Sequence, residues 1–583
     1  MVKKILSEVK EYKWPSIITP LFMILEVAME MIVPYLMASI IDDGVNKKDM
    51  NHILIVGLYM VIAAVIGFAG GLLGGKYGAI ASTGLAKNLR KAMYDRIQTF
   101  SFSNIDRFST SSLVTRLTTD VTNIQNAYHM VLRMAMRAPA SLIVAMCMAF
   151  YINARIARIY LIAVFFLAIV ATIIVSGATK TFREAFPKYD ALNESVQENV
   201  TAIRVVKAYV RENEQIDRFK KASDAIYKIF CKAEGRVVIS FPIMSATVYT
   251  CILTISWIGA RMIVVDELTT GELMSLLTYC MNILMSLMML SMVFVMITMS
   301  AASGERIVEV LNEESDITNP ADPVMTVSDG SVRFENVSFA YDHDKGGKNV
   351  LENINLDIRS GETIGIMGAT GSSKSTLVSL ISRLYDATEG AVYVGSVNVR
   401  DYDLETLRNS VSVVLQKNQL FSGTIIENLR WGKADATEEE CRKACEMACA
   451  DEFISRMTDG YNTYIEQGGT NVSGGQKQRL CIARALLKSP KILILDDSTS
   501  AVDTATDAKI RAAFRSEIPG VTKFIIAQRI SSISDADRII VLDNGHISGI
   551  GTHEELLENN EIYREVYDSQ TGGSGDFDET EVD

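Results

Sequence analysis

A short segment rich in glycine and serine carries the residue types that bind phosphate. It follows the apolar run Thr363–Met367 and precedes a helical pattern. In such a loop, backbone N–H groups and a helix N-terminus bind phosphate oxygens, a lysine reaches the β and γ phosphates, and a hydroxyl binds Mg²⁺. The sequence predicts an ATP site, with Ser375 as a Mg²⁺ ligand, from these residues: Gly368, Ala369, Thr370, Gly371, Ser372, Ser373, Lys374, Ser375 and Thr376.

Ser373 stands where loops of this kind have glycine, directly before the lysine. Glycine permits a positive φ and a close approach of the backbone to phosphate, so a side chain here costs about 1–3 kcal/mol. Every other part of the loop is present, and ATP binding remains the interpretation.

Further polar residues lie where other apolar runs end, and such runs are typical of buried strands. Asp496 and Asp497 end the run that begins at Lys491, Gln528 follows the run that begins at Phe524, and Gln416 follows the run that begins at Val411. Carboxylate and amide oxygens at strand ends can bind a metal ion or orient water. The elements that must position these residues are therefore alternating strands and helices of an α/β domain.

The segment Asn471–Arg479 closely resembles the signature of ATP-binding-cassette (ABC) ATPases, with Val472 for the usual leucine. The resemblance implies that Tyr341 stacks on adenine, that Gln416 and Asp496 join Ser375 at Mg²⁺, and that Asp503 lies in the D-loop. It also implies that the signature acts on ATP held by a second subunit, through Ser473, Gly474, Gly475 and Gln476.

Two residues depart from the ABC pattern at the catalytic positions. Asp497 stands where the family has glutamate, and Gln528 stands where it has histidine. The shorter side chain withdraws the carboxylate by roughly 1.5 Å, and glutamine cannot titrate near neutral pH as histidine does. We expect this chain to bind ATP and to hydrolyse it poorly at its own site.

Because we expect this chain to hydrolyse ATP poorly at its own site, we also expect a partner subunit. The chain resembles the degenerate-site subunit of bacterial heterodimeric, multidrug-type (type IV) ABC exporters, and the resemblance covers nearly the whole chain. It implies a second homologous subunit with an intact catalytic glutamate and histidine, whose site this chain's signature completes.

The first half of the chain contains six apolar stretches long enough to cross a bilayer of about 30 Å. They are separated by alternating short and long connections, and they comprise Ser16–Ile41, Ile53–Ile80, Val131–Ile152, Ile159–Ser176, Val238–Val264 and Leu273–Thr298. The long connections, near Ser82–Met130 and Gly177–Val237, are rich in lysine and arginine. The positive-inside rule places both of them, the N-terminus and the second half of the chain in the cytoplasm, which predicts a multi-pass protein of the cell (inner or plasma) membrane.

Ionisable and methionine side chains within these stretches are candidates for a substrate cavity. Glu26 and Glu30 share one helix face, and Arg133 and Arg137 share another. A methionine stripe follows helical spacing in the sixth stretch and contains Met281, Met285, Met288 and Met292. A structural ion pair and ordinary helix packing explain the same patterns, so both alternatives stay open.

The fold class that we expect is an all-α six-helix transmembrane domain followed by an α/β P-loop ABC nucleotide-binding domain. The expected parts are a membrane domain (1–310), a linker (311–329), a nucleotide-binding domain (330–570) and a disordered tail (571–583). Three of the eight cysteines, Cys441, Cys445 and Cys449, share a helix face, and we expect buried packing rather than a metal site.

The leading functional hypothesis is an ATP-driven exporter subunit for hydrophobic or amphipathic small molecules, with ATP and Mg²⁺ as cofactors and the lipid bilayer as its surroundings. A net charge of −12 argues against a nucleic-acid partner. One alternative is an ABC transporter of lipid, peptide or a metal chelate. Another is a non-pumping, ATP-gated channel or regulator, in which weak hydrolysis would be the purpose.

Overall fold

The structure is a computed structural model that describes residues 1–341 and 347–571. The expected tail lies outside the described residues from position 572 onward. The chain forms two compact units. The membrane unit comprises Met1–Thr99 and Phe108–Glu313, and the nucleotide unit comprises Phe100–Arg107 together with the chain from Glu314 onward.

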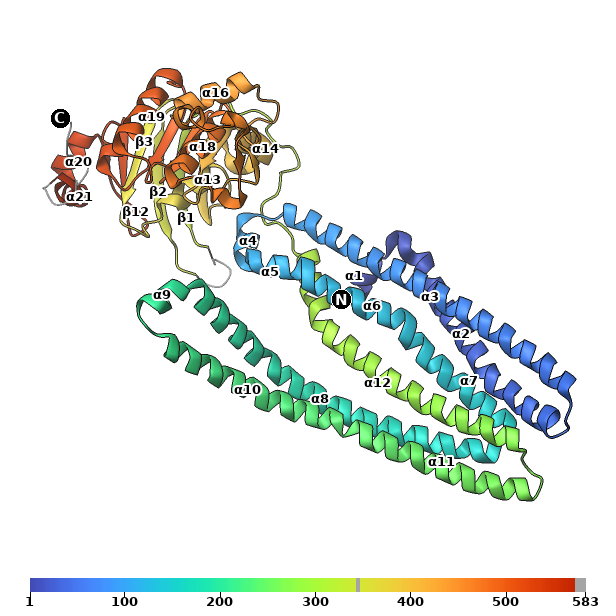
Figure 1. Cartoon of the computed structure of the whole chain (residues 1–583). Coiled ribbons are helices and arrows are strands. Elements are labelled where there is room, and N and C mark those ends of the chain that lie inside the picture. The colour runs from blue at the N-terminus through green and yellow to red at the C-terminus, as the bar shows by residue number, and fades with distance from the viewer. Residues whose placement is uncertain (342–346, 572–583) are drawn as a thin grey trace. The chain divides into compact units, whose positions relative to one another are not determined.

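The membrane unit consists of helices, several of which pack along most of their length (Figure 1). Among the described residues, six helical segments are long and apolar enough to cross a membrane. The helices are α1 (Val2–Ser7), α2 (Lys13–Ser39), α3 (Met50–Gln98), α5 (Thr110–Thr115), α6 (Val121–Met130), α7 (Met136–Ile152), α8 (Ala154–Thr201), α9 (Ile203–Ala208), α10 (Glu212–Val238), α11 (Ser240–Val264) and α12 (Thr270–Asn312).

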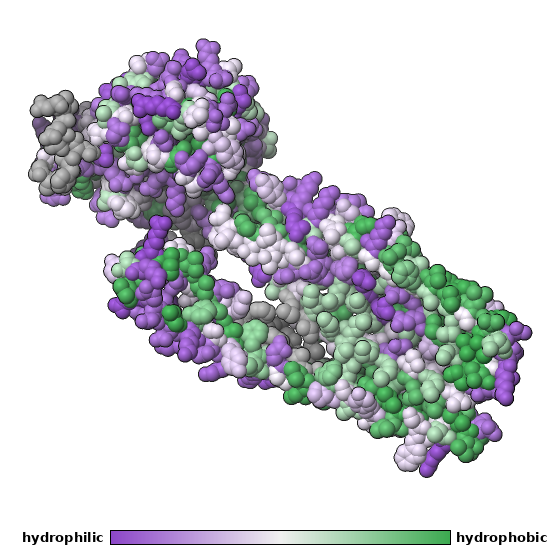
Figure 2. Space-filling model, viewed as in Figure 1, coloured by the Kyte–Doolittle hydropathy of each residue, from purple (hydrophilic) through white to green (hydrophobic). Residues whose placement is uncertain are grey.

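The long basic connections are continuations of the spanning helices. Helix α3 has 49 residues and α8 has 48, so each is about 70 Å long at 1.5 Å per residue and exceeds a bilayer core of about 30 Å. Side-chain caps fix where several helices begin: Asp49 caps α3, Asn153 caps α8, and Thr269 forms a capping box with Glu272 at α12. On the face that Figure 2 shows, hydrophobic residues are most frequent in the part of this unit that lies away from α9.

The core of the membrane unit lies between α2, α7, α8, α11 and α12. Two buried tyrosines donate hydrogen bonds to helix carbonyls there: Tyr160 to Leu276 at 2.8 Å, and Tyr279 to Met31 at 2.7 Å. A buried hydroxyl without an acceptor would destabilise the core, so these bonds help to fix the register of α12 against its neighbours.

The nucleotide unit is an α/β domain built on two main sheets. A four-stranded antiparallel sheet has the order β2-β1-β4-β5, and a six-stranded sheet has the order β12-β11-β3-β10-β9-β6. The strands are β1 (Val332–Phe339), β2 (Leu351–Ile358), β3 (Thr363–Gly368), β4 (Glu389–Val394), β5 (Val397–Asn398), β6 (Val411–Val414), β9 (Ile492–Asp496), β10 (Thr522–Ile526), β11 (Arg538–Asp543) and β12 (His546–Gly551), with the small pair β7 (Gly423–Thr424) and β8 (Tyr464–Ile465).

Five strands of the larger sheet, β11, β3, β10, β9 and β6, are parallel, and β12 pairs antiparallel at the edge. Strands β9 and β10 are buried at every position, as expected for parallel strands covered on both faces. The helices are α4 (Phe102–Phe108), α13 (Lys374–Ile381), α14 (Leu404–Ser410), α15 (Ile425–Leu429), α16 (Glu438–Met447), α17 (Asp451–Ile454), α18 (Gly474–Leu486), α19 (Thr504–Glu517), α20 (His553–Asn559) and α21 (Glu561–Thr571). The expected fold class is confirmed.

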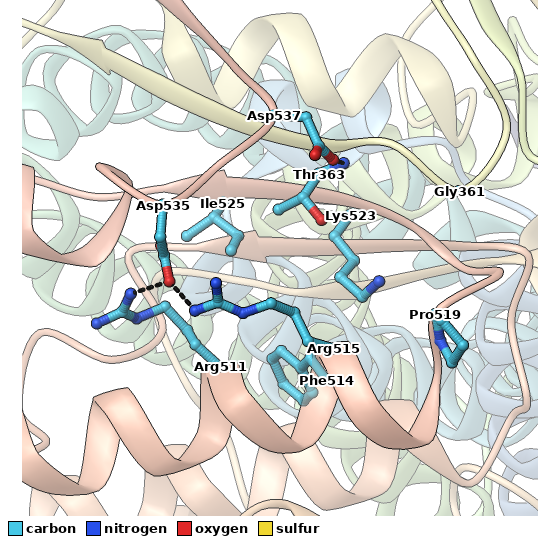
Figure 3. Close-up of a pocket in the computed structure, with 10 residues that line it drawn as sticks. All are labelled: Gly361, Thr363, Arg511, Phe514, Arg515, Pro519, Lys523, Ile525, Asp535 and Asp537. Carbon is cyan, nitrogen blue, oxygen red and sulfur yellow. Dashed lines mark hydrogen bonds and ion pairs between the residues drawn. The ribbon is translucent and has the colours of Figure 1, made fainter. Parts of the chain in front are cut away.

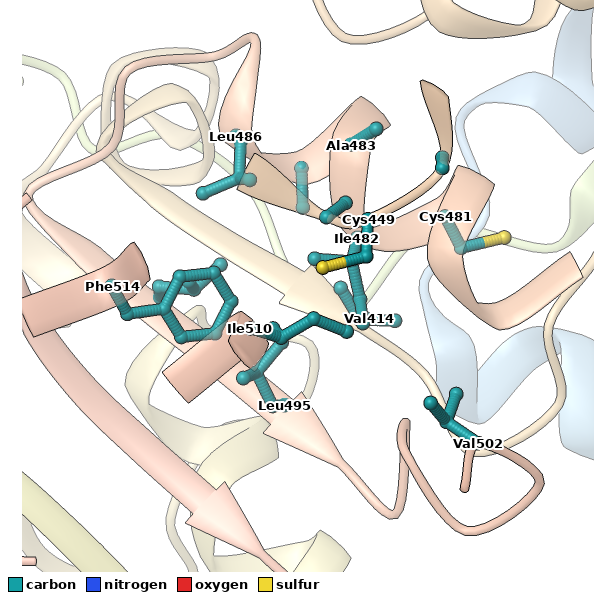
Figure 4. Close-up of a cluster of buried hydrophobic side chains, with 14 of the residues drawn as sticks. Val414, Cys449, Cys481, Ile482, Ala483, Leu486, Leu495, Val502, Ile510 and Phe514 are labelled. Atoms are coloured by element: carbon teal, nitrogen blue, oxygen red, sulfur yellow. The ribbon is translucent and has the colours of Figure 1, made fainter. Parts of the chain in front are cut away.

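The cysteines on and just after α16 are core residues. Cys441, Cys445 and Cys449 are buried, and Cys449 lies near Ile482 and Ile510 in a cluster of apolar side chains (Figure 4). Burial raises the pKa of the Cys445 thiol to about 12, which keeps it neutral. In the described ranges, no group of three or more histidine, cysteine or acidic side chains could hold a metal ion. The burial of all three cysteines confirms the expected packing.

Candidate nucleotide site

The phosphate loop lies at the carboxyl end of β3, near the middle of the larger sheet, and leads into α13. Two of its glycines have positive φ, Gly368 at +153° and Gly371 at +88°. A Cβ at Gly368 would lie 2.2 Å from the Leu542 carbonyl oxygen, so only glycine fits there. Because parallel strands present ligand-binding residues at their carboxyl ends, the neighbouring strands β6, β9 and β10 bring their end residues to the same edge.

Lys374 is held within the loop. Its Nζ donates to the carbonyls of Gly368 and Ala369, both at 2.8 Å, and to Ser372 Oγ at 3.4 Å. Burial lowers the pKa of Lys374, and the charges of Asp496 and Asp497 oppose that shift. The loop therefore concentrates positive charge and backbone N–H donors where phosphate would bind.

Ser373 adopts the left-handed conformation, with φ at +70° and ψ at +24°, and its side chain makes no capping hydrogen bond to α13. The positive φ expected at this position is present. A serine in this region is strained relative to glycine.

Asp496 ends β9 and accepts a hydrogen bond from Ser375, the predicted Mg²⁺ ligand at the start of α13. Burial raises the pKa of the Asp496 carboxyl, and the hydrogen bond from Ser375 opposes the rise. The hydroxyl and the carboxylate thus form a pair of hard oxygen donors, which suits Mg²⁺.

Asp497 follows β9 with φ at +49°, in the left-handed region. Gln528 Nε2 donates to Asp497 Oδ2 at 3.0 Å, and the Gln416 side chain also hydrogen-bonds this carboxylate. Burial raises the pKa of Asp497, and the two amide contacts oppose the rise. The structure thus brings both altered catalytic positions and Gln416 into direct contact.

Tyr341 lies beside the loop from the end of the antiparallel sheet. Its hydroxyl hydrogen-bonds Thr376 Oγ1 at 2.8 Å, and 51% of the residue is exposed. An exposed tyrosine ring anchored next to the phosphate loop is suitably placed to contact a base.

The signature residues surround the start of α18. Ser473 caps the helix by accepting from the Gln476 backbone at 3.3 Å, and Gln476 Oε1 accepts from the Ser473 N–H at 2.9 Å. A Cβ at Gly475 would lie 2.6 Å from the Ala501 carbonyl, so the signature packs against the D-loop. Asp503 of that loop caps α19 by accepting from the Thr506 N–H at 2.9 Å. Among the described residues, the Ser473 side chain bonds within its capping box and not to this chain's phosphate loop.

Comparison with known proteins assigns the chain to a family. Residues 16–288 match the family described as ABC transporter transmembrane region, and residues 351–500 match the family described as ABC transporter. The ABC transporter ATP-binding protein YfiB of Bacillus subtilis (strain 168) is 37% identical over 577 residues, which cover 98% of this chain and 99% of that protein. The chain belongs to the ABC transporter family.

Other relatives agree with this ABC transporter assignment. The ATP-dependent lipid A-core flippase of Desulfotalea psychrophila (strain LSv54 / DSM 12343) is 30% identical over 578 residues, covering 98% of this chain and 99% of the flippase. A bacterial Atm1-family ABC exporter solved with ATP bound has the same fold, with a TM-score of 0.83, 24% identity, and coverage of 96% of this chain and 99% of that chain. This ABC transporter is thus a multi-pass membrane protein with a cytoplasmic, ATP-binding ABC ATPase domain.

One contact in the nucleotide site of this ABC transporter was missed by the sequence reasoning. Gln570 in α21 accepts from the Ile530 N–H at 2.9 Å and donates to the Gln528 carbonyl at 2.9 Å. It therefore holds the backbone on both sides of Arg529, in the loop that carries Gln528. No motif marks Gln570, because a glutamine on an amphipathic helix has the same local pattern as a solvated residue.

A separate pocket of about 190 Å³ lies at the end of the larger sheet where β3 and β10 begin, opposite the end that carries the phosphate loop (Figure 3). Its lining includes Thr363, the first residue of β3, and Lys523 near the start of β10. Arg511 and Arg515 both pair with Asp535 there. The two arginine charges are thus paired within the wall, and the pocket is separate from the phosphate loop.

In the membrane unit, the structure brings together three of the four candidate charges. Arg137 Nη1 lies 2.5 Å from Glu26 Oε1, and Arg137 Nη2 lies 2.8 Å from Glu30 Oε2. The Arg133 side chain instead packs beside Gly78 of α3. The candidate methionines of α12 are exposed in the single chain, and they are Met281, Met285, Met288 and Met292.

Proposed function

We propose that this chain is one subunit of a heterodimeric, ATP-driven exporter of hydrophobic or amphipathic small molecules. It binds ATP at a degenerate site and supplies its signature to the catalytic site of the partner. The observation that carries the proposal is the contact between Gln528 and Asp497. Both altered positions belong to one site and satisfy each other's hydrogen bonds.

The chemistry of this pair disfavours hydrolysis. The aspartate carboxylate is withdrawn by roughly 1.5 Å relative to glutamate, and a misplacement of about 1 Å can reduce turnover on the order of 100-fold. Two amides, from Gln416 and Gln528, already hydrogen-bond this carboxylate. Gln528 can donate to a γ-phosphate but cannot gain a positive charge near neutral pH.

ATP and Mg²⁺ fit the remaining residues. Lys374 and the loop N–H groups would bind the phosphates, and Ser375, Gln416 and Asp496 would hold Mg²⁺ through oxygen atoms. When bound, the ion neutralises phosphate charge and orients the γ-phosphate. Tyr341 would stack on adenine, and these residues together favour a long-lived ATP at this site.

The partner must supply what this site lacks. The capping box at Ser473 and Gln476 leaves the N-terminus of α18 ordered, with N–H groups suited to a γ-phosphate. We propose that it completes a site whose phosphate loop, catalytic glutamate and histidine belong to a second homologous ABC subunit. Hydrolysis there would drive the change between inward- and outward-facing states.

The substrate class is proposed from the membrane unit. The exposed methionines of α12 offer a flexible, polarizable surface that suits varied apolar molecules. The Arg137–Glu26–Glu30 group adds charge of both signs, which suits amphipathic molecules with a polar end. Lipid is the second candidate, and it is favoured by the 30% identity to a lipid A-core flippase over 98% of this chain.

The test is ATP turnover by this chain alone, by the pair, and by the pair in which the partner's catalytic glutamate is changed to glutamine. We expect turnover only in the pair, its loss with the partner's change, and little effect of Asp497→Asn in this chain. Equal turnover by this chain alone would contradict the heterodimer, because Asp497 and Gln528 would then suffice.

A further inference from the structure

A short segment of the first cytoplasmic connection belongs to the nucleotide unit. Phe100–Arg107, which contains most of α4, groups with that unit although the chain on either side belongs to the membrane unit. Ser101 and Ser103 both donate to the Asp316 carboxylate, and Asn104 Nδ2 donates to the Glu314 carbonyl at 3.2 Å. These bonds attach α4 to the start of the nucleotide unit's own chain.

A second attachment runs through Tyr385, which follows the phosphate-loop helix α13. The Tyr385 hydroxyl donates to Asp106 Oδ2 at 2.6 Å. Its ring contacts Phe102 edge-on, with centroids 5.9 Å apart. Burial raises the pKa of Tyr385, and the bond to Asp106 raises it further, so the hydroxyl remains a donor at every physiological pH.

The same ring contacts the residue that is placed to bind adenine. The Tyr341 and Tyr385 rings meet at 90° with centroids 5.2 Å apart, and Phe339 packs against both rings. The Tyr341 hydroxyl is bonded to Thr376 at the start of α13. A continuous series of contacts therefore joins Asp106, Tyr385, Tyr341 and Thr376.

We propose that Tyr385 is a positioning residue that couples adenine binding at Tyr341 to the seating of α4 through Asp106. The proposal rests on the proposed role of Tyr341 at adenine, and it identifies the contacts through which adenine binding affects α4. An edge-to-face contact fixes the plane of each ring, so the plane of Tyr341 available to a base depends on where Tyr385 is held. Because coupling of binding free energies is reciprocal, adenine bound at Tyr341 must strengthen the seating of α4 as much as α4 strengthens adenine binding.

The test is a double-mutant cycle on the full-length chain in lipid nanodiscs. The affinities for ATP and for inorganic triphosphate are measured by calorimetry for wild type, Asp106→Ala, Tyr385→Phe, Tyr341→Ala and the double variants with Tyr341→Ala. We expect Asp106→Ala and Tyr385→Phe, each of which removes the hydrogen bond between these two residues, to weaken ATP binding by roughly fivefold, the lower end of usual allosteric couplings. Neither change should act once Tyr341 is alanine, and triphosphate, which has no base, should bind all variants alike.

Asp316→Ala is the matched control. It removes the acceptor of Ser101 and Ser103, but it leaves the contacts of Asp106 with Tyr385 and of Tyr385 with Tyr341 in place. ATP affinity should remain at the wild-type value in this variant. Unchanged triphosphate affinity shows that each variant is folded at the phosphate loop.

Three results would overturn the proposal: no change in ATP affinity with Asp106→Ala, equal weakening of ATP and triphosphate, or an equal effect of Asp316→Ala. A failure of the heterodimeric exporter proposal is distinguishable, because it is decided by turnover with a partner and not by base-dependent binding to this chain. Wild-type binding of triphosphate and ATP with equal affinity would remove the role of Tyr341 itself.

Discussion

Gln528 Nε2 donates to Asp497 Oδ2 at 3.0 Å, across the carboxyl ends of the adjacent strands β10 and β9. Each side chain partly satisfies the other, and Gln416 completes the group. Gln528→His alone would place a histidine beside an aspartate whose carboxylate lies further back than that of a glutamate. Asp497→Glu alone would place a glutamate beside an amide that cannot become charged. The two positions therefore form one hydrogen-bonded pair.

Restoring the pair should restore hydrolysis. We expect Asp497→Glu or Gln528→His alone to raise ATP turnover weakly, and the double variant to raise it by about 100-fold over wild type, the range of a well-placed general base. The measurement is phosphate release with the partner's catalytic glutamate changed to glutamine, so that only this site is active. Adding Lys374→Ala should abolish the gain, and additive single effects would argue against a pair.

Replacing Ser373 should relieve backbone strain. We expect Ser373→Gly to raise the free energy of unfolding by about 1 kcal/mol, because glycine adopts φ near +70° without the Cβ clash. ATP affinity should rise with it. Thermal unfolding and calorimetry provide the check. The control is Ser379→Gly in the middle of α13, which should lower stability by about 0.5–1 kcal/mol, and a loss of stability at both positions would contradict the strain.

The buried carboxylate predicts a pH dependence. Burial raises the pKa of Asp497 in the folded state, so the folded chain binds this proton more tightly and its stability falls as pH rises through the two pKa values. The amide introduced by Asp497→Asn does not titrate. The stability advantage of this variant over wild type should therefore be smallest in acid, grow with pH and level off above the folded pKa.

The same comparison at Asp503 should show the opposite dependence of stability on pH. The Thr506 N–H, which donates to Asp503 at the start of α19, lowers the pKa of Asp503. Relative to wild type, Asp503→Asn should lose stability as pH rises from acid. Parallel curves for the two variants in thermal unfolding would contradict both assignments.

The two hydrogen bonds of Gln570 predict that the backbone of the loop that carries Gln528 is protected from hydrogen exchange. Gln570→Ala removes both hydrogen bonds, and we expect faster hydrogen exchange at the Ile530 amide together with a loss of about 1 kcal/mol. Gln570→Glu keeps the acceptor for Ile530 and should retain most of the protection. Thr571→Ala, which affects a bond within α21 only, should leave exchange at Ile530 unchanged.

The charged group in the membrane unit predicts a compensating pair. Arg137→Gln leaves Glu26 without its cationic partner and should destabilise the chain by about 1–3 kcal/mol, the cost of losing a hydrogen bond to a charged group. Adding Glu26→Gln should recover part of this loss, because the less exposed of the two carboxylates that pair with Arg137 is then no longer an unpaired charge. Arg133→Gln is the control, since Arg133 packs beside Gly78 instead. Thermal unfolding in nanodiscs of defined lipid provides the measurement.

Local sequence patterns were sufficient to predict the membrane-spanning helices and the strands at the nucleotide site. Apolar length predicted the six spans, and the strands ending at Asp496 and near Gln528 were predicted within about two residues of β9 and β10. The left-handed φ at Ser373 also followed from the glycine position of the loop. These features are encoded within a few residues of one another.

The contacts that distinguish this nucleotide site join residues that are far apart in the sequence. Gln528 with Asp497, Gln570 with Gln528, and Tyr385 with Asp106 join residues that are 31, 42 and 279 positions apart. Periodicity places Asp497 and Gln528 at the ends of strands but does not say that their side chains meet, and no local pattern marks Gln570 or Tyr385. The resemblance to ABC exporters implies that the tips of the two long connections dock on the nucleotide-binding domains, so the grouping of α4 with the nucleotide unit was expected. The individual contacts, such as that of Tyr385 with Asp106, were not predicted.

The position of Gln570 also sets an order for assembly on the ribosome. The Gln528 loop leaves the synthesis centre 42 residues before the side chain that secures it. At roughly 5–20 residues per second this interval is about 2–8 s, during which the central strands can form while the loop lacks its anchor. A message interrupted just upstream of codon 570 would thus yield a chain with its membrane helices and its sheet, but with an unsecured loop beside the phosphate site.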